Sequence, residues 1–339
     1  MKLVMTLLAR NEADVVDAQI AFHLHAGVDF VIATDNCSDD GTLEILEAYA
    51  RTGRLHLLTE AGEDMRQDEW VTRMARMAAT DFGAHWVINT DADEFWWPRG
   101  GTLKDVLGLV PERYGVVRGC WRHFLPRTEV QPDFAERMTV RLCAPAFPGD
   151  KSTIYHAHQK VAHRADAGVV IERGNHDAAG PVLEQPLRGW HPIEVLHFSL
   201  RSVEQLERKA RGGWLQSPVA VQTEHQLLLG HAYREGKLDA FYAEHAISDA
   251  GLERGLADGS LAVDTRLRDV LRTLREPDGR YRVSEARTTL AFETPDLADT
   301  AAYAAEASVL VGIDGIVRAE QRVDALEARL ARLRTLPRR

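Results

Sequence analysis

The chain has 339 residues, of which 45% are hydrophobic and 27% are charged. This is the composition of a globular protein with enough residues for one large domain or two smaller ones. The formal net charge of −10 argues against a general nucleic-acid binder, because phosphate-backbone binding needs a basic surface. It does not exclude a phosphorylated small molecule, since one metal ion can reverse the local field.

The three cysteines, Cys37, Cys120 and Cys143, are far apart and form no CxxC pair. This pattern predicts reduced thiols in a cytoplasmic protein. The first run, "MKLVMTLLAR", is too short for a transmembrane helix and no small-residue cleavage pattern follows it. It therefore favours a first β-strand over a signal peptide. No later run approaches a membrane span, so we expect no transmembrane segment.

Strands and helices are predicted to alternate through the first hundred residues. Continuous apolar runs predict strands at 2–9, 29–35, 54–60 and 85–91. Helical spacing of apolar residues, mostly closed by glycine, predicts helices at 12–27, 38–53 and 66–83. This order indicates a Rossmann-like α/β fold with a mainly parallel sheet and helices on both faces.

Polar stretches follow three of these strands, at 9–12 (ARNE), 35–42 (DNCSDDGT) and 91–94 (DADE). Ligands of open parallel sheets bind beyond the carboxyl ends of the strands. We therefore expect the three stretches to converge on one ligand site.

The regular alternation stops after residue 110. Residues 115–200 indicate strands and loops rich in His, Arg and Trp, and 203–250 indicate helices. Near the C-terminus Ile316, Val323 and Leu330 recur seven apart, which suits either a packed helix or a dimerising coiled coil. We predict a domain at 1–215 with a nucleotide-binding half (1–110) and an acceptor half (111–215). A helical extension at 216–305 and a C-terminal helix at 306–339 follow, with a possible coiled-coil homodimer through 314–336.

The acids Asp91, Asp93 and Glu94 end an apolar run and precede Trp96 and Trp97. In an extended segment alternate side chains share a face, so Asp91 and Asp93 are predicted on one face. Glu94 is predicted to face elsewhere and to hold the loop by hydrogen bonds. Two carboxylates on one face suit Mg²⁺ or Mn²⁺; the alternative is a solvated pair in a turn. The two tryptophans either flank a sugar pocket or belong to the core.

Three stretches, "LLARNEADVV", "DNCSDDGT" and "WVINTDADEF", resemble at these intervals the family 2 type of glycosyltransferase with a GT-A fold. The resemblance is to a branch that carries "DADEF" and a later histidine followed by an aromatic residue, Ser, Glu and Lys, matched here by "HFSLRSVEQLERKARGG" at 197–213. It covers about residues 1–215. It implies a metal-dependent, inverting transfer of a sugar from a nucleotide-diphosphate donor, with a UDP-sugar expected, to a glycan or small-molecule acceptor.

The resemblance also implies roles for single positions. Asp35 would accept a hydrogen bond from the base or ribose, although Asn36 and Cys37 depart from the usual "DDGSTDGT". Asp91, Asp93 and His197 would hold the Mn²⁺ or Mg²⁺. The full set expected to bind or border the nucleotide sugar is Ala9, Arg10, Asn11, Glu12, Asp35, Gln67, Asp91, Ala92 and Asp93, with Arg66 beside Gln67.

The chemistry is consistent with these roles. A metal that bridges the diphosphate oxygens stabilises the leaving group as a Lewis acid, and a neutral imidazole is a reasonable ligand for Mn²⁺. An inverting transfer also needs a general base near the acceptor hydroxyl. Asp177 is the leading candidate, with Glu172 and Glu194 as rivals; each is otherwise a loop carboxylate. His176, beside Asp177, would contact acceptor or donor phosphate.

Residues 118–191 mix aromatic and cationic side chains, which makes Trp121 and Trp190 plausible sugar platforms or core residues. The "HAH" at 156–158 has no third ligand with zinc-site spacing. Lys209 and Arg211 suit either phosphate contacts or a solvated helix face. Two alternatives to a glycosyltransferase stay open: a non-catalytic interaction protein, and a sugar-nucleotidyltransferase or phosphatase. For the latter, "LLARNEAD" offers neither a Gly-rich phosphate loop nor a convincing nucleophilic Asp.

Overall fold

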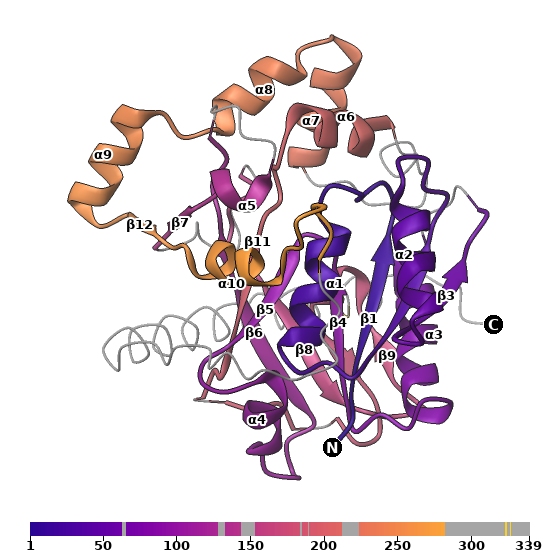
Figure 1. Ribbon diagram of the computed structural model, residues 1–339. Coiled ribbons are helices and arrows are strands. Elements are labelled where there is room, and N and C mark those ends of the chain that lie inside the picture. Colours follow the sequence, from indigo (N-terminus) through magenta and orange to yellow (C-terminus); the bar gives the residue numbers. More distant parts are fainter. Residues whose placement is uncertain are drawn as a thin grey trace, which may run out of the picture.

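The computed structural model describes residues 1–62, 66–127, 133–143, 153–183, 185–188, 190–211 and 224–281, with Val323 and Leu326. Among these residues the largest element is an eight-stranded sheet with the strand order β3-β2-β1-β4-β8-β6-β11-β5 (Figure 1). Its strands are β1 (Leu3–Ala9), β2 (Phe30–Asp35), β3 (Leu55–Thr59), β4 (Trp86–Asp91), β5 (Glu94–Pro98), β6 (Val116–His123), β8 (Gln159–Arg164) and β11 (Ile193–His197).

The first half of the sheet confirms the predicted alternation. β1 to β4 are parallel and are connected by α1 (Val16–His25), α2 (Thr42–Arg51) and α3 (Gln67–Thr80). β2 and β3 lie on one side of β1, and β4 lies on the other. The direction of winding therefore reverses beside β1, and open α/β sheets bind ligands at such a point, beyond the carboxyl ends of the strands.

Helices cover both faces of the sheet, as predicted. On one face α1, α2 and α10 (Arg266–Leu274) contribute Phe22, Leu46 and Leu271 to a shared core. On the other face α3 packs through Val71 and Met74. Because both faces are covered, the strands of the parallel half are continuous apolar runs rather than alternating ones.

The second half of the sheet is mixed. β8 runs antiparallel to both β4 and β6, β11 is parallel to β6, and β5 closes the edge antiparallel to β11. The remaining described strands form two small pairs, β7 (Val140–Leu142) with β12 (Leu261–Val263) and β9 (Val170–Ile171) with β10 (Ala178–Ala179). The remaining described helices are α4 (Leu103–Gly108), α5 (Phe134–Arg137), the 3₁₀ helix η1 (Arg173–Asn175), α6 (Val203–Arg211), α7 (Glu224–Arg234), α8 (Leu238–His245) and α9 (Asp249–Asp258).

Apart from Val323 and Leu326, the chain beyond Tyr281 lies outside the described residues. The predicted C-terminal helix at 306–339 and the coiled-coil homodimer through 314–336 fall almost entirely in that part. The predicted domain boundaries stay predictions. Among the described residues no helix is both long enough and apolar enough to cross a membrane.

Candidate functional site

Three neighbouring strands bring Glu94, His197 and His123 into one row across the sheet. His197 is in register with Glu94 on antiparallel β5 and with His123 on parallel β6. Residues in register on adjacent strands point to the same face of a sheet. The row is buried, because Glu94 is 0%, His123 1% and His197 8% exposed.

Asp93, in the turn between β4 and β5, lies next to Glu94 and His197 of this row. One ligand atom each from Asp93, Glu94 and His197 lies within 4.8 Å of the others, so the three side chains form a group able to hold one metal ion. Two carboxylates and an imidazole are a donor set suited to Mn²⁺ and acceptable to Mg²⁺. The residues present therefore fit a divalent cation.

The predicted orientation of Glu94 away from this site is wrong. Ala92 and Asp93 form a turn and not an extended segment, so strand alternation does not carry across from Asp91 to Glu94. The prediction that Glu94 holds the loop is confirmed, since its Oε2 accepts a hydrogen bond from the Asp91 backbone N–H at 3.1 Å. Glu94 thus takes the place beside Asp93 that the sequence pattern assigned to Asp91.

Lys160, on β8, bridges Asp91 to Glu94 of the metal-binding group. Its Nζ lies 2.6 Å from Asp91 Oδ2 and 2.9 Å from Glu94 Oε1. Burial by itself favours the neutral amine, but Asp91 and Glu94 outweigh it and raise the pKa of Lys160. Gln67 and Asn175 donate to the other oxygen of Asp91, at 3.3 and 3.1 Å. The Asp91 carboxylate is therefore held by three donors.

A second set of cations approaches Asp93 from the segment that follows β11. Lys209 Nζ, on α6, lies 3.1 Å from Asp93 Oδ2, and Arg201 Nη1 lies 3.7 Å from the same atom. Burial alone would raise the pKa of Asp93, but Lys209, His197 and Arg201 together lower it below its ordinary value. Asp93 is therefore ionised at neutral pH and ready to bind a cation.

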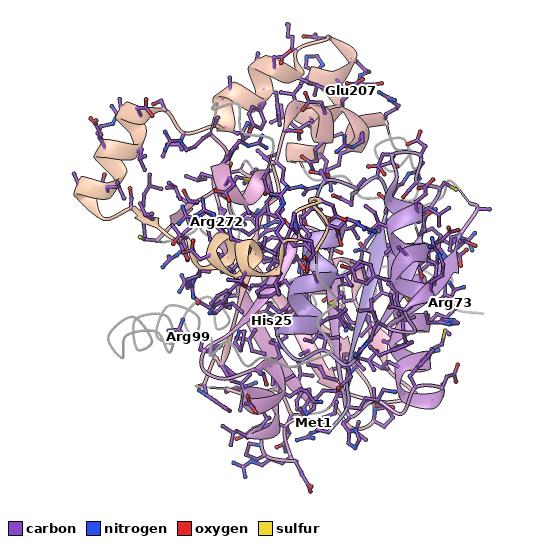
Figure 2. All side chains as sticks on the ribbon, in the orientation of Figure 1. Met1, His25, Arg73, Arg99, Glu207 and Arg272 are labelled. Carbon is purple, nitrogen blue, oxygen red and sulfur yellow. The ribbon has the colours of Figure 1, made fainter. Side chains whose placement is uncertain are left out.

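Arg201 also ties this segment to the loop after β1. It is 0% exposed, its guanidinium contacts the Glu12 carboxylate, and its Nε donates to Asp14 Oδ2 at 2.7 Å. Glu12, which is predicted to line the nucleotide pocket, thus forms an ion pair with Arg201. Arg211 instead pairs with Glu207 at 2.7 Å on the solvated face of α6, and Figure 2 shows Glu207 at the outer edge of the molecule.

The loops after β1 and β2 meet, as expected for one ligand site. Arg10 Nη1 donates to Asn36 Oδ1 at 3.1 Å, and the Asn11 backbone N–H donates to Ser38 Oγ at 3.0 Å. Asp35, at the end of β2, is 3% exposed and its Oδ2 accepts from the Ser38 N–H at 3.1 Å. Its Oδ1 is buried and has no hydrogen-bond partner among the described residues. Ala9 is buried at the end of β1.

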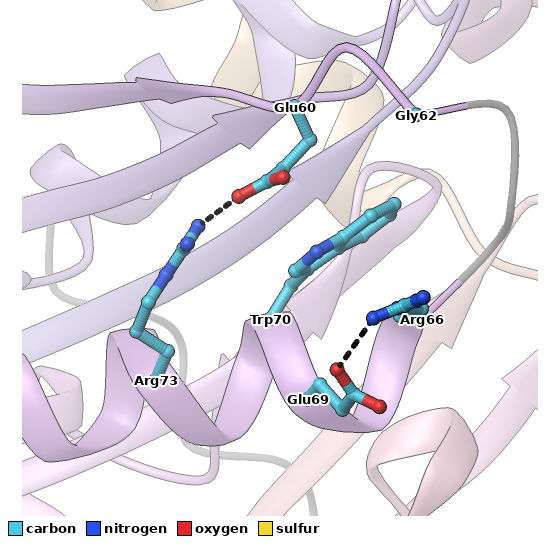
Figure 3. Close-up of a pocket in the computed structure, with 6 residues that line it drawn as sticks. All are labelled: Glu60, Gly62, Arg66, Glu69, Trp70 and Arg73. Carbon is cyan, nitrogen blue, oxygen red and sulfur yellow. Dashed lines mark ion pairs between the residues drawn. The ribbon is translucent and has the colours of Figure 1, made fainter.

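A cavity of about 330 Å³ opens next to these loops, between the end of β3 and the start of α3. Figure 3 shows two ion pairs at its wall, Arg73 with Glu60 at 2.6 Å and Arg66 with Glu69 at 3.6 Å. Asn36 donates to the backbone carbonyls of Glu60 and Gly62, which line the cavity. The loop that carries Asp35 is therefore hydrogen-bonded to residues of the cavity wall.

Trp121 lies between the metal-binding group and a set of histidines. Its ring stacks on His197 with centroids 4.2 Å apart, and its Nε1 donates to Glu94 Oε1 at 2.9 Å. On the far side the rings of His158 and His176 stack with centroids 3.4 Å apart and meet Trp121 edge-on. The predicted platform role remains open for Trp121, which is partly exposed.

The other tryptophans are placed differently. Trp96 and Trp97 are 0% and 2% exposed and belong to the main core, so of the two alternatives for this pair the core is confirmed and the sugar pocket is not. Consecutive apolar residues on β5 face the two covered sides of the sheet, and both are buried. Trp190 is 39% exposed. Among the described residues no metal-binding group includes His156 or His158.

The three candidate bases lie in distinct surroundings. Glu194 is 1% exposed and is held by Arg266, Arg122 and Arg99 at 2.8, 2.9 and 3.1 Å.

Burial alone would raise the pKa of Glu194, but the three arginines lower it to about 2, which makes this carboxylate a weak base. Glu172 is exposed at the start of η1. Asp177 is half-buried, with Oδ1 3.6 Å from Arg118 Nη2. Its sequence neighbour His176 meets the Trp121 ring edge-on, so Asp177 is one residue from a side chain that contacts the surroundings of the metal-binding group.

The sequence did not single out Lys160, Arg201 or His123, and it assigned Glu94 to the loop instead of the metal-binding group. Lys160 and His123 lie on strands whose partners are more than thirty positions away in the chain. The only signal in the sequence was the density of His, Arg and Trp in residues 115–200.

No family model and no curated protein matches the sequence.

Among solved structures, the chain is similar to glucosyl-3-phosphoglycerate synthase from Mycobacterium tuberculosis in complex with Mn²⁺, UDP and glucosyl-3-phosphoglycerate. The identity is 21% over 36% of this chain and 44% of that chain, with a TM-score of 0.27. It is also similar to S. aureus TarS 1–349, with 13% identity over 86% of this chain and 99% of that chain and a TM-score of 0.34. TarS 1–349 in complex with UDP gives 12% identity, 87% and 100% coverage and a TM-score of 0.33. The chain spans less than half of the synthase.

Proposed function

We propose that this protein is a metal-dependent glycosyltransferase. It moves a sugar from a nucleotide-diphosphate donor, with UDP as the nucleotide, to a glycan or small-molecule acceptor, with inversion. The observation that carries the proposal is the Asp93–Glu94–His197 group, in which the turn after β4 meets the end of β11. Carboxylates gathered beside basic side chains at the carboxyl ends of strands suit a cation and a diphosphate together.

The residues divide between donor and metal. Asp93, Glu94 and His197 would hold Mn²⁺ or Mg²⁺, which supplies Lewis-acid stabilisation of the leaving diphosphate when bound. Asp35 offers a buried acceptor oxygen to a base or ribose hydroxyl. Lys209 lies 3.1 Å from Asp93 and would share the charge of the diphosphate. In this arrangement the chain's own residues fix where negative charge gathers on the donor.

Calorimetric titration of UDP and of GDP, each with and without Mn²⁺, tests the proposal. We expect UDP to bind only with the metal and Asp93→Asn to remove that binding. GDP should bind more weakly. If neither nucleotide bound with metal present, a non-catalytic interaction protein would be the better description. If Asp93→Asn bound UDP and Mn²⁺ like the unmodified protein, the assigned metal site would be wrong.

We assign the general base to Asp177, because Glu194 is held by three arginines and Glu172 is an exposed residue at the start of η1. Asp177→Asn should lower kcat for transfer by about 10²–10⁴-fold while UDP binding in the presence of Mn²⁺ is unchanged. Glu172→Gln is the matched control and should leave kcat within about twofold, because its exposed carboxylate takes no proton in the reaction. Equal losses in the two variants would contradict the assignment. Donor hydrolysis over a panel of nucleotide sugars supplies the rate assay before the acceptor is known.

A further inference from the structure

Two histidines and one backbone carbonyl form a hydrogen-bonded chain that ends at the proposed metal site. His123 Nε2 lies 2.8 Å from the carbonyl oxygen of His156. His123 Nδ1 lies 3.3 Å from His197 Nδ1. His197 Nε2 then faces Asp93 Oδ1 at 3.8 Å. Both ring nitrogens of each histidine are therefore assigned to a neighbour.

The protons along this chain follow from the chemistry of its first member. A carbonyl oxygen only accepts hydrogen bonds, so His123 must carry its proton on Nε2. The ring of His123 is buried, and its two polar contacts are a carbonyl and an imidazole rather than a carboxylate. A buried imidazolium without an anion is unfavourable, so the ring is neutral and its Nδ1 is an acceptor. His197 must then carry its proton on Nδ1 and donate it to His123. The Nε2 lone pair of His197 is left facing the carboxylate of Asp93.

This last contact suits a bound cation. A separation of 3.8 Å is too long for a hydrogen bond, and a lone pair directed at a carboxylate gains nothing in a buried site. A metal ion between the two atoms would bind both. Histidine ligands to metals donate their other ring N–H to a fixed acceptor, which sets the tautomer and the ring orientation.

We propose that His123 is a positioning residue that sets the tautomer of His197 so that His197 Nε2 can bind the metal. The proposal rests on the metal site of the proposed function and deepens it. The backbone carbonyl of His156 fixes the tautomer of His123, and His123 in turn fixes the tautomer of His197. His123 itself touches neither metal nor donor.

Long-range ¹H–¹⁵N correlation NMR of the metal-free, ¹⁵N-histidine-labelled protein reads each tautomer directly. Signals are identified from single histidine variants. We expect the Nε2–H form at His123 and the Nδ1–H form at His197. An Nε2–H form at His197, or a doubly protonated ring at neutral pH, would overturn the proposal. Because no metal is present, this readout decides the tautomers even if UDP turns out not to bind.

Mn²⁺ affinity supplies the second readout. His123→Leu removes the acceptor, and we expect about 10–100-fold weaker Mn²⁺ binding. In His123→Asn the side-chain oxygen can accept the His197 N–H, so most of the affinity should return. Exposed His231, on α7, gives the control variant His231→Ala, which should bind Mn²⁺ normally. Equal loss in the Leu and Asn variants, both folded by circular dichroism, would reduce His123 to a packing residue and contradict the proposal.

Discussion

Lys209 is the cation whose partner should change when donor binds. Its Nζ pairs with Asp93, which the metal also needs. We therefore expect Lys209→Gln to weaken UDP binding in the presence of Mn²⁺ by about 10–100-fold, the range of one hydrogen bond to a charged group. UMP, with one phosphate fewer, should lose less. The matched control is Arg211→Gln on the exposed face of the same helix. Calorimetry on the two variants measures both effects, and equal loss for UDP and UMP would contradict a contact to the outer phosphate.

Glu194 illustrates a buried carboxylate used for stability. Its pKa is lowered to about 2 by its arginines and is about 4.3 in an unfolded chain. A lowered folded-state pKa stabilises the protein above the unfolded value, and this stabilisation is lost as pH falls toward 2. We expect Glu194→Gln to cost about 3 kcal/mol of unfolding free energy at pH 7. The difference from the unmodified protein should shrink below about pH 4. Urea unfolding at several pH values measures it, and a pH-independent difference would refute the ion-pair origin.

At the scale of elements, α10 is the part of the predicted helical extension that joins the sheet. Leu267 and Leu271 belong to the same core as α1 and the strands, and Leu271 is 3% exposed. Leu271→Ala should lower the unfolding free energy by about 2–5 kcal/mol, whereas exposed Thr273→Ala should change it by less than about 0.5 kcal/mol. Because the core is shared, tryptophan fluorescence and circular dichroism should report one transition. An early transition restricted to the helices would instead place α10 in a separate domain.

The success of sequence reasoning differed between the two halves of the sheet. In the parallel half each strand is buried on both faces, so apolar runs and capping glycines located every element up to Asp91. The first wrong prediction concerns the orientation of Glu94. The turn at Ala92 and Asp93 interrupts the strand, so alternation along the strand cannot be used to place Glu94. Beyond it, Lys160 became a site residue only through the pairing of β8 with β4 and β6. Such pairing joins residues distant in the chain and leaves no periodic signal along it.

For the molecule as a whole, the charge that gathers at residues 91–94 is partly compensated without a metal. Lys160, from β8, neutralises one side of the acidic turn. Lys209 and Arg201, from the segment after β11, neutralise the other. Both cationic groups lie after residue 110, and the acids lie before it. The fold thus places cations from the second half of the chain beside the acidic turn that ends the first half. Their proximity explains how the carboxylates of Asp91, Asp93 and Glu94 can lie close together.

This balance predicts that metal and nucleotide bind together. A cation alone must compete with Lys209 for Asp93, so Mn²⁺ by itself should bind weakly and raise the melting temperature little. UDP would offer Lys209 a new partner, and Asp93, Glu94 and His197 would hold the Mn²⁺ next to it, so each ligand should strengthen the other by the same factor. With UDP at about 100 times its Kd and Mn²⁺ present, the expected gain is about 2.7 kcal/mol, or roughly 3–5 °C in thermal unfolding. EDTA should abolish the shift, and Asp93→Asn should never show it. If Mn²⁺ alone produced the full increase in melting temperature, Lys209 would not compete with the metal for Asp93.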